Sequence, residues 1–111
     1  PPPIDETTIK GFLALFDEPA AEIVDLFLAD VRAKLETLRQ QTETIDPQTL
    51  ANLAHELKSS SAQIGALHMS DMLQELENLA ETEEPHLALK QFVHIEDEYN
   101  RVCQALQQHV R

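Results

Sequence analysis

One segment in the middle of this 111-residue chain reads Leu50-Ala51-Asn52-Leu53-Ala54-His55-Glu56-Leu57-Lys58-Ser59-Ser60-Ser61-Ala62-Gln63-Ile64-Gly65-Ala66. Its apolar residues recur at spacings of three and four, which is typical of one face of an α-helix. When the segment is wound at about 100° per residue, one face gathers within an arc of about 100°. That face consists of Leu50, Leu53, Ala54, Leu57, Ser61 and Ile64. The pattern predicts a helix that buries one side in a core.

The same spacing continues along the rest of the chain, and strict alternation of apolar and polar residues is nowhere sustained. Helix starts are expected where an acidic residue can cap the helix or precedes a proline, because a proline N–H is not needed in the first turn. These starts are Asp5, Asp17-Glu18-Pro19, Asp46-Pro47 and Glu84-Pro85. Gly65 ends the central helix, because glycine adopts positive φ without a Cβ penalty, and residues 65–67 are expected to form a tight reversal.

Four further helices carry apolar stripes. They are Ile9, Phe12, Leu13 and Phe16; Ile23, Val24, Phe27, Leu28, Val31, Leu35 and Leu38; Met69, Met72, Leu73, Leu76 and Ala80; and Leu89, Phe92, Ile95, Tyr99, Val102 and Leu106. Short connections imply antiparallel neighbours. We therefore predict an all-α fold, an up-down antiparallel four-helix bundle with a short additional N-terminal helix. No large apolar face is left over, so a monomer is expected.

The length of the chain fits a single domain, since domains have about 100–150 residues. Residues 1–4, which include three prolines, are interpreted as a linker remnant, and residues 5–111 as the bundle domain. A start at Pro1-Pro2-Pro3 favours a fragment cut from a longer chain at a proline-rich linker.

Charge and composition exclude several function classes. The chain has 20 acidic and 8 basic residues, a net charge of −12, and nucleic-acid binding relies on the opposite balance. Its two glycines, Gly11 and Gly65, stand too far apart for a phosphate-binding loop. No apolar run approaches the roughly 18 residues of a membrane span. The lone Cys103 favours a cytoplasmic location. Glu83-x-x-His86 is the single Glu-x-x-His pair and a proline interrupts it, so no metal site is expected.

His55 stands out on the central helix, because it lies about 150° from the centre of the apolar arc and therefore points away from the bundle. Lys58, Ser59 and Ala62 share its face, and Ala51 lies one turn before it. Small residues let another molecule approach the imidazole, so we expect Ala51 and Ala62 to contribute to partner docking. A lysine one turn away can stabilise negative charge, and imidazole is a nucleophile near neutral pH. The pattern predicts an imidazole exposed for phosphoryl transfer.

The segment 54–66 resembles the signature of histidine-containing phosphotransfer (HPt) domains, commonly written A-H-x-L-K-[GS]-[SA]-[SA]-x-x-[IL]-G-[AL]. The short leading helix and the Leu76-Glu77 pair are also similar to the family's layout. Ser59 stands where the family most often has glycine, and Gln63 where asparagine is common. The resemblance implies that His55 takes a phosphoryl group from an aspartyl phosphate on one receiver domain and passes it to the aspartate of another.

The resemblance also implies the partners and roles of the remaining site residues. Lys58 would stabilise the phosphoryl group, Ser59 would hydrogen-bond to it, and Gly65 would be structural. The chain would need no cofactor of its own, because Mg²⁺ comes from the partner receiver domain, and it would have no ATP-dependent activity alone. The partners would be receiver domains of response regulators or a hybrid histidine kinase, and the chain would be a cytoplasmic module, free-standing or part of a membrane-bound sensor kinase.

Two alternatives remain open at this point. The first is a non-catalytic helical adaptor that docks a receiver domain or a partner helix through its small-residue face. The second is the substrate domain of a chemotaxis-type kinase, in which the same histidine is phosphorylated from ATP by a domain elsewhere in the chain.

Overall fold

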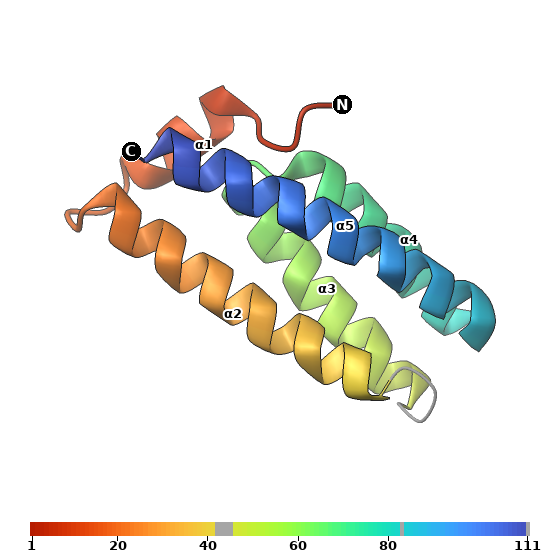
Figure 1. Ribbon diagram of the computed structural model, residues 1–111. Coiled ribbons are helices and arrows are strands. Elements are labelled where there is room, and N and C mark those ends of the chain that lie inside the picture. Colours follow the sequence, from red (N-terminus) through yellow and green to blue (C-terminus); the bar gives the residue numbers. More distant parts are fainter. Residues whose placement is uncertain (42–45, 83, 111) are drawn as a thin grey trace.

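The computed structural model describes residues 1–41, 46–82 and 84–110. Within them the helices are α1 (Glu6–Leu13), α2 (Ala20–Gln41), α3 (Pro47–Gln63), α4 (Leu67–Glu81) and α5 (Pro85–His109). The four longer helices run side by side, and α1 lies across the end of the bundle at which α5 finishes (Figure 1). The predicted architecture of a four-helix bundle with an additional N-terminal helix is confirmed. No helix in the described ranges is both long enough and apolar enough to cross a membrane.

The order of the helices around the bundle decides which surface carries the site. The most extensive contact is between α3 and α4, and α4 also packs against α5. α2 lies beside α3 and α5 with fewer contacts, and α1 touches α3. The helices α3 and α5 are therefore on opposite corners of the bundle. His109 Nδ1 lies 3.0 Å from Glu6 Oε2, and this contact joins the end of α5 to the start of α1.

Two of the expected caps are present in the structure. The Asp5 carboxylate accepts a hydrogen bond of 2.9 Å from the Thr8 N–H, and Asp46 accepts one of 3.1 Å from the Thr49 N–H. The bonds from the hydroxyl and N–H of Thr8 hold the pKa of Asp5 below its usual value. Pro19 is expected in the first turn of the second helix, but α2 begins one residue later, at Ala20. The Pro19 carbonyl accepts hydrogen bonds from the Glu22 and Ile23 N–H groups of that turn.

The apolar stripes meet in one core, as the periodicity predicts. Its largest fully buried side chains are Ile9, Val24, Val31, Leu38, Leu57, Ile64, Met69, Leu73, Leu76, Ile95, Val102 and Leu106. Two expected core residues are exposed. Phe16 lies beyond the end of α1, and Leu89 points outward because Ala88 takes the core position one residue earlier. The core stripe of α5 then continues through Phe92 and Ile95.

The N-terminal segment is part of the packed body. Ile4 is buried, the Asp5 N–H donates to the Gly65 carbonyl at 2.8 Å, and the Arg101 guanidinium donates to the Pro1 carbonyl at 3.1 Å. Residues 1–4, interpreted from the sequence as a linker remnant, thus contact the bundle in this structure. The apolar Ile4 is what anchors this segment.

The reversal between α3 and α4 takes the form that glycine predicts. Gly65 has a φ of +92°, and the N–H groups of Gly65 and Ala66 donate to the Ala62 and Ser61 carbonyls at 3.2 and 2.8 Å. These bonds satisfy carbonyls that the end of a helix leaves free. The reversal brings α4 back along α3, which is the contact that builds the candidate site.

The buried Tyr99 provides a test of packing between α5 and α2. Its hydroxyl donates to the Leu28 carbonyl at 2.9 Å, and burial raises the pKa of the Tyr99 phenol to about 12. An unfolded tyrosine ionises near pH 10. We therefore expect Tyr99 to leave stability unchanged below pH 10 and the free energy of unfolding to fall as the pH rises from about 10 to 12. Because the chain has one tyrosine, phenolate absorption against pH measures this directly. A midpoint near 10 in the folded protein would contradict the packing.

Candidate functional site

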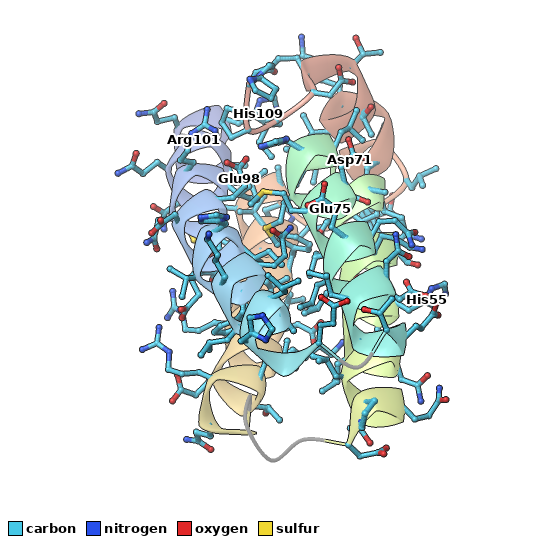
Figure 2. All side chains as sticks on the ribbon, turned by 90° about the vertical axis from the view of Figure 1, so that its right-hand side faces the viewer. His55, Asp71, Glu75, Glu98, Arg101 and His109 are labelled. Carbon is cyan, nitrogen blue, oxygen red and sulfur yellow. The ribbon has the colours of Figure 1, made fainter. Side chains whose placement is uncertain are left out.

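His55 projects from the middle of α3 away from the bundle (Figure 2). Its side chain is 60% exposed, whereas Leu57 and Ser61 on the other side of the helix are fully buried. The amphipathic pattern of α3 sets this orientation, because burying the apolar stripe turns the histidine outward. The imidazole can therefore be reached by another macromolecule.

A carboxylate from α4 lies directly behind the imidazole. Glu77 Oε1 is 3.4 Å from His55 Nδ1 and 3.3 Å from Lys58 Nζ, so one oxygen atom faces both groups. Lys58 Nζ also donates to Gln74 Oε1 at 2.7 Å. The His55 and Lys58 side chains, one turn apart on α3, are thus held together through two residues one turn apart on α4.

Lys58 and Glu77 are partly buried, which strengthens the electrostatic interaction between them. The Glu77 side chain is 18% exposed and that of Lys58 23% exposed. Charges that are partly removed from water are screened less than those on an open surface. Gln74 is itself fixed, because its amide donates to Asn78 Oδ1 at 3.0 Å. The lysine charge therefore has a defined position beside the imidazole.

The position of Glu77 decides which imidazole nitrogen is free. An ionised carboxylate only accepts hydrogen bonds, so it favours the tautomer with the proton on His55 Nδ1. The other nitrogen, Nε2, is then unprotonated and carries a lone pair on the exposed side of the ring. In general, an imidazole with one free nitrogen is a nucleophile, and a carboxylate at its other nitrogen can balance the positive charge that substitution of the ring creates.

The family model of the Hpt domain matches residues 22–108. The chain belongs to the Hpt domain family. Hpt domains take part in phosphorelays, in which they interact with receiver domains. No curated protein sequence gives a significant match to this Hpt domain.

Two solved structures share the fold of this Hpt domain. Histidine-containing phosphotransfer protein B (HptB) from Pseudomonas aeruginosa PAO1 is 24% identical and superposes with a TM-score of 0.90, covering 97% of this chain and 94% of that protein. A rice protein, solved as a candidate histidine-containing phosphotransfer protein, is 18% identical with a TM-score of 0.81, covering 99% and 87%. At these identities the likeness concerns the fold, which is retained over nearly the whole chain.

The serines that follow the histidine in this Hpt domain bond to their own helix. The Ser59 hydroxyl donates to the His55 carbonyl at 3.2 Å, Ser60 to Glu56 at 3.2 Å, and the buried Ser61 to Leu57 at 2.7 Å. Such bonds to the carbonyl four residues earlier satisfy serine within a helix. In this structure the Ser59 hydroxyl proton is thus directed along the helix and not toward the imidazole.

The two alanines expected on the docking face of the Hpt domain differ in position. Ala62 is partly exposed beyond Ser59, as expected. Ala51 is only 8% exposed and belongs to the core, so its expected exposure beside His55 is wrong. The reason is the close packing of α4 on α3, which covers the side of α3 that Ala51 occupies.

Sequence reasoning also missed residues of this site. No sequence pattern points to Gln74, and Glu77 is indicated only by the family's Leu76-Glu77 pair. The reversal at Gly65 brings both residues to the site. The sequence predicts this reversal, but it does not predict which α4 residues then lie opposite His55 and Lys58. Across residues 1–41, 46–82 and 84–110, no three His, Cys, Asp or Glu side chains are placed to hold a metal ion. Glu83 of the Glu83-x-x-His86 pair lies outside the described residues.

Proposed function

We propose that this Hpt domain is a phosphorelay intermediate in which His55 is the phosphorylated residue. It accepts a phosphoryl group from the aspartyl phosphate of one receiver domain and delivers it to the aspartate of another. The observation that supports this most is the shared carboxylate oxygen of Glu77, which lies between the inner nitrogen of His55 and the Lys58 ammonium. In this proposal the arrangement prepares Nε2 for attack and keeps a cation within one helical turn of the imidazole.

The reaction requires one bond to form and one to break. The Nε2 lone pair attacks the phosphorus, and the bond between phosphorus and the receiver aspartate oxygen breaks, which releases the aspartate carboxylate. The Nδ1 proton stays on the ring, where the Glu77 carboxylate balances the positive charge. Transfer to the second receiver is the reverse sequence with a different aspartate. Catalysis of this kind depends on positioning and charge stabilisation, and we expect Mg²⁺ to be supplied by the receiver domain.

Lys58 acts on the phosphoryl group in this proposal. Its flexible stem allows the ammonium to leave Gln74 and contact a phosphoryl oxygen on Nε2 while it stays near Glu77. Ser59 is one turn from His55, and rotation of its hydroxyl would provide a further hydrogen bond to the phosphoryl group. Both residues lie on the exposed face of α3, where a receiver domain would approach.

We expect Lys58→Ala to slow phosphoryl transfer by about tenfold. Removing one preorganised donor to a developing oxyanion lowers rates by about 10²–10³ in enclosed sites, and solvent reduces the effect at this open one. The free energy of unfolding should change by about 1 kcal/mol or less, because the partly exposed Lys58 loses only its contacts with Gln74 and Glu77 and leaves the core intact. Rapid-quench measurement of transfer from a phosphorylated receiver domain checks the rate.

The matched control for this substitution is Lys34→Ala. Lys34 is similarly exposed and pairs with Asp30 at 3.0 Å and Glu56 at 3.7 Å, without any contact to the imidazole. Its removal should leave the rate within about twofold of the parent. Equal rates for Lys58→Ala and the parent would remove the role assigned to Lys58.

The proposed relay is tested by a transfer and chase experiment. A receiver domain phosphorylated with labelled phosphate is mixed with the chain, and an unphosphorylated second receiver is then added. We expect the label to appear on the chain in an acid-labile, base-stable linkage and then to move to the second receiver. Receiver binding without any label on the chain would instead support the adaptor. Label that comes only from ATP, through a separate kinase domain, would support the chemotaxis-type substrate domain.

The proposal also includes the setting of the domain. We place it in the cytoplasm as a monomer that meets its receivers by diffusion or as a module of a hybrid sensor histidine kinase. Size-exclusion chromatography with light scattering tests the monomer.

A further inference from the structure

The first five residues form a non-helical segment that is fastened to the bundle at three points. Ile4 is 7% exposed, the Asp5 N–H donates to the Gly65 carbonyl at 2.8 Å, and Arg101 Nη2 donates to the Pro1 carbonyl at 3.1 Å. The segment is thereby attached to the α3–α4 reversal and to α5. We call residues 1–5 the strap.

The strap does not pack closely against α4. A cleft of about 260 Å³ lies between them and is lined by Pro1, Pro2, Asp5, Leu67, His68 and Asp71. Pro1 and Pro2 are themselves exposed, so Ile4 is the one fully seated side chain of the strap. Segments with few buried apolar contacts open at a lower free energy than the core of a protein. We therefore expect the strap to leave the bundle without unfolding of the four long helices.

A buried carboxylate lies where the strap meets α5. The Glu98 side chain is 4% exposed, and its Oε1 accepts a hydrogen bond of 2.8 Å from Nη1 of the half-exposed Arg101. Its other oxygen, Oε2, is also buried and has no hydrogen-bond partner among residues 1–41, 46–82 and 84–110. A buried charged oxygen without a donor destabilises the state that buries it, because its hydration has been lost.

One guanidinium joins this carboxylate to the strap. Arg101 donates to Glu98 from one nitrogen and to the Pro1 carbonyl from another, so both acceptors lie beside the same group. Figure 2 shows Glu98 and Arg101 toward the end of the bundle that α1 covers. Departure of the strap would admit water to Glu98 from this end, whereas a seated strap leaves Arg101 as the counter-charge of the carboxylate.

We propose that the strap is a conformational switch with a seated and a released state, in which the Glu98 carboxylate favours release and Arg101 favours seating. The switch goes beyond the proposed phosphoryl transfer and does not depend on it. In the seated state Ile4 is buried and Glu98 Oε2 lacks a donor. In the released state Ile4 is exposed and water hydrates the carboxylate. Because Asp5 also caps α1, release removes this cap and loosens α1 at the end of the bundle.

The test is hydrogen exchange of the Asp5 amide, measured by NMR, because release breaks its bond to the Gly65 carbonyl. Arg101→Met removes the bond to Pro1 and leaves the Glu98 charge buried without its counter-charge. We expect exchange of the Asp5 amide to become about 10- to 100-fold faster, since an unpaired buried charge is strongly unfavourable. Exchange of the Leu57 and Ile95 amides in the core should stay within about threefold of the parent, because the strap opens locally.

A second substitution isolates the contribution of the carboxylate. Glu98→Gln, added to Arg101→Met, replaces the charge by a neutral amide of the same shape, which is easier to bury. Exchange of the Asp5 amide should then be at least about fivefold slower than in the Arg101→Met chain, although the bond to Pro1 is still missing. None of these measurements involves phosphoryl transfer, so their outcome is separate from that of the proposed function.

The matched control is Arg39→Met, which removes the guanidinium that pairs with Glu96 on the same helix, α5. The Glu96 side chain is 24% exposed and stays hydrated, so exchange of the Asp5 amide should be unchanged. An unchanged rate in Arg101→Met would overturn the switch, as would an equal acceleration at Leu57 and Ile95, because the whole bundle would then open. If Glu98→Gln failed to slow exchange in the Arg101→Met chain, the carboxylate would not drive release and the inference would be wrong.

Discussion

Replacing His55 by alanine is expected to reduce phosphoryl transfer from a receiver domain by more than about 10³-fold, because the nucleophile itself is removed. The side chain is exposed and packs against no core residue, so the bundle should be retained. The free energy of unfolding should change by less than about 0.5 kcal/mol. Quantification of labelled chain after incubation with a phosphorylated receiver domain measures the loss, and circular dichroism during thermal unfolding measures stability.

The control for this variant is His94→Ala, which removes another exposed histidine from α5. His94 lies on the helix opposite α3, and its replacement should leave labelling unchanged. If the His55→Ala chain accepted label as well as the parent, the phosphorylated residue would be another one and the role assigned to the Glu77 carboxylate would be lost as well.

Replacing Gly65 by alanine is expected to give the largest loss of stability. Gly65 has a φ of +92°, and a Cβ built there would lie 2.9 Å from the Asp5 carbonyl oxygen and 3.3 Å from the Ile9 nitrogen. Both neighbours are backbone atoms and cannot move away alone. Strain from the left-handed conformation and from the close contact together should cost about 2–4 kcal/mol. The midpoint of thermal unfolding should fall by about 10–25 °C.

The chain contains a control for Gly65 in its other glycine. Gly11 lies in α1, and a Cβ there would have no heavy atom within 4 Å. Gly11→Ala should therefore raise stability by up to about 1 kcal/mol, because alanine is the better helix former. If Gly65→Ala unfolded at the same temperature as the parent, the contact between α1 and the end of α3 would be wrong.

The helical fold follows from sequence because local physics determines most of it. The caps at Asp5 and Asp46 and the glycine after α3 are signals that each act over a few residues. The structure differs from the sequence prediction at positions whose burial depends on how neighbouring helices pack. Leu89 fits the spacing of a core stripe as well as Ala88 does, and only the position of α5 against its neighbours selects the smaller residue. Ala51 likewise becomes buried because α4 covers it.

The candidate site shows the same difference between features of one helix and contacts between helices. The exposure of His55 and its spacing from Lys58 are properties of one helix and could be predicted from the order of residues. The contacts of Gln74 and Glu77 belong to the pairing of α3 with α4, across a reversal whose exact register is a tertiary property. The exposed position of the histidine that we propose as the phosphoryl acceptor could thus be predicted from the sequence, whereas the α4 residues beside it required the structure.

The most direct test of this account is to locate the phosphoryl group on the protein. A nitrogen-labelled chain is phosphorylated by a receiver domain and examined by heteronuclear NMR of nitrogen and phosphorus. We expect phosphorus coupled to Nε2 of His55, with Nδ1 protonated and facing Glu77. Phosphorus on any other residue, or on Nδ1 of His55, would contradict the account.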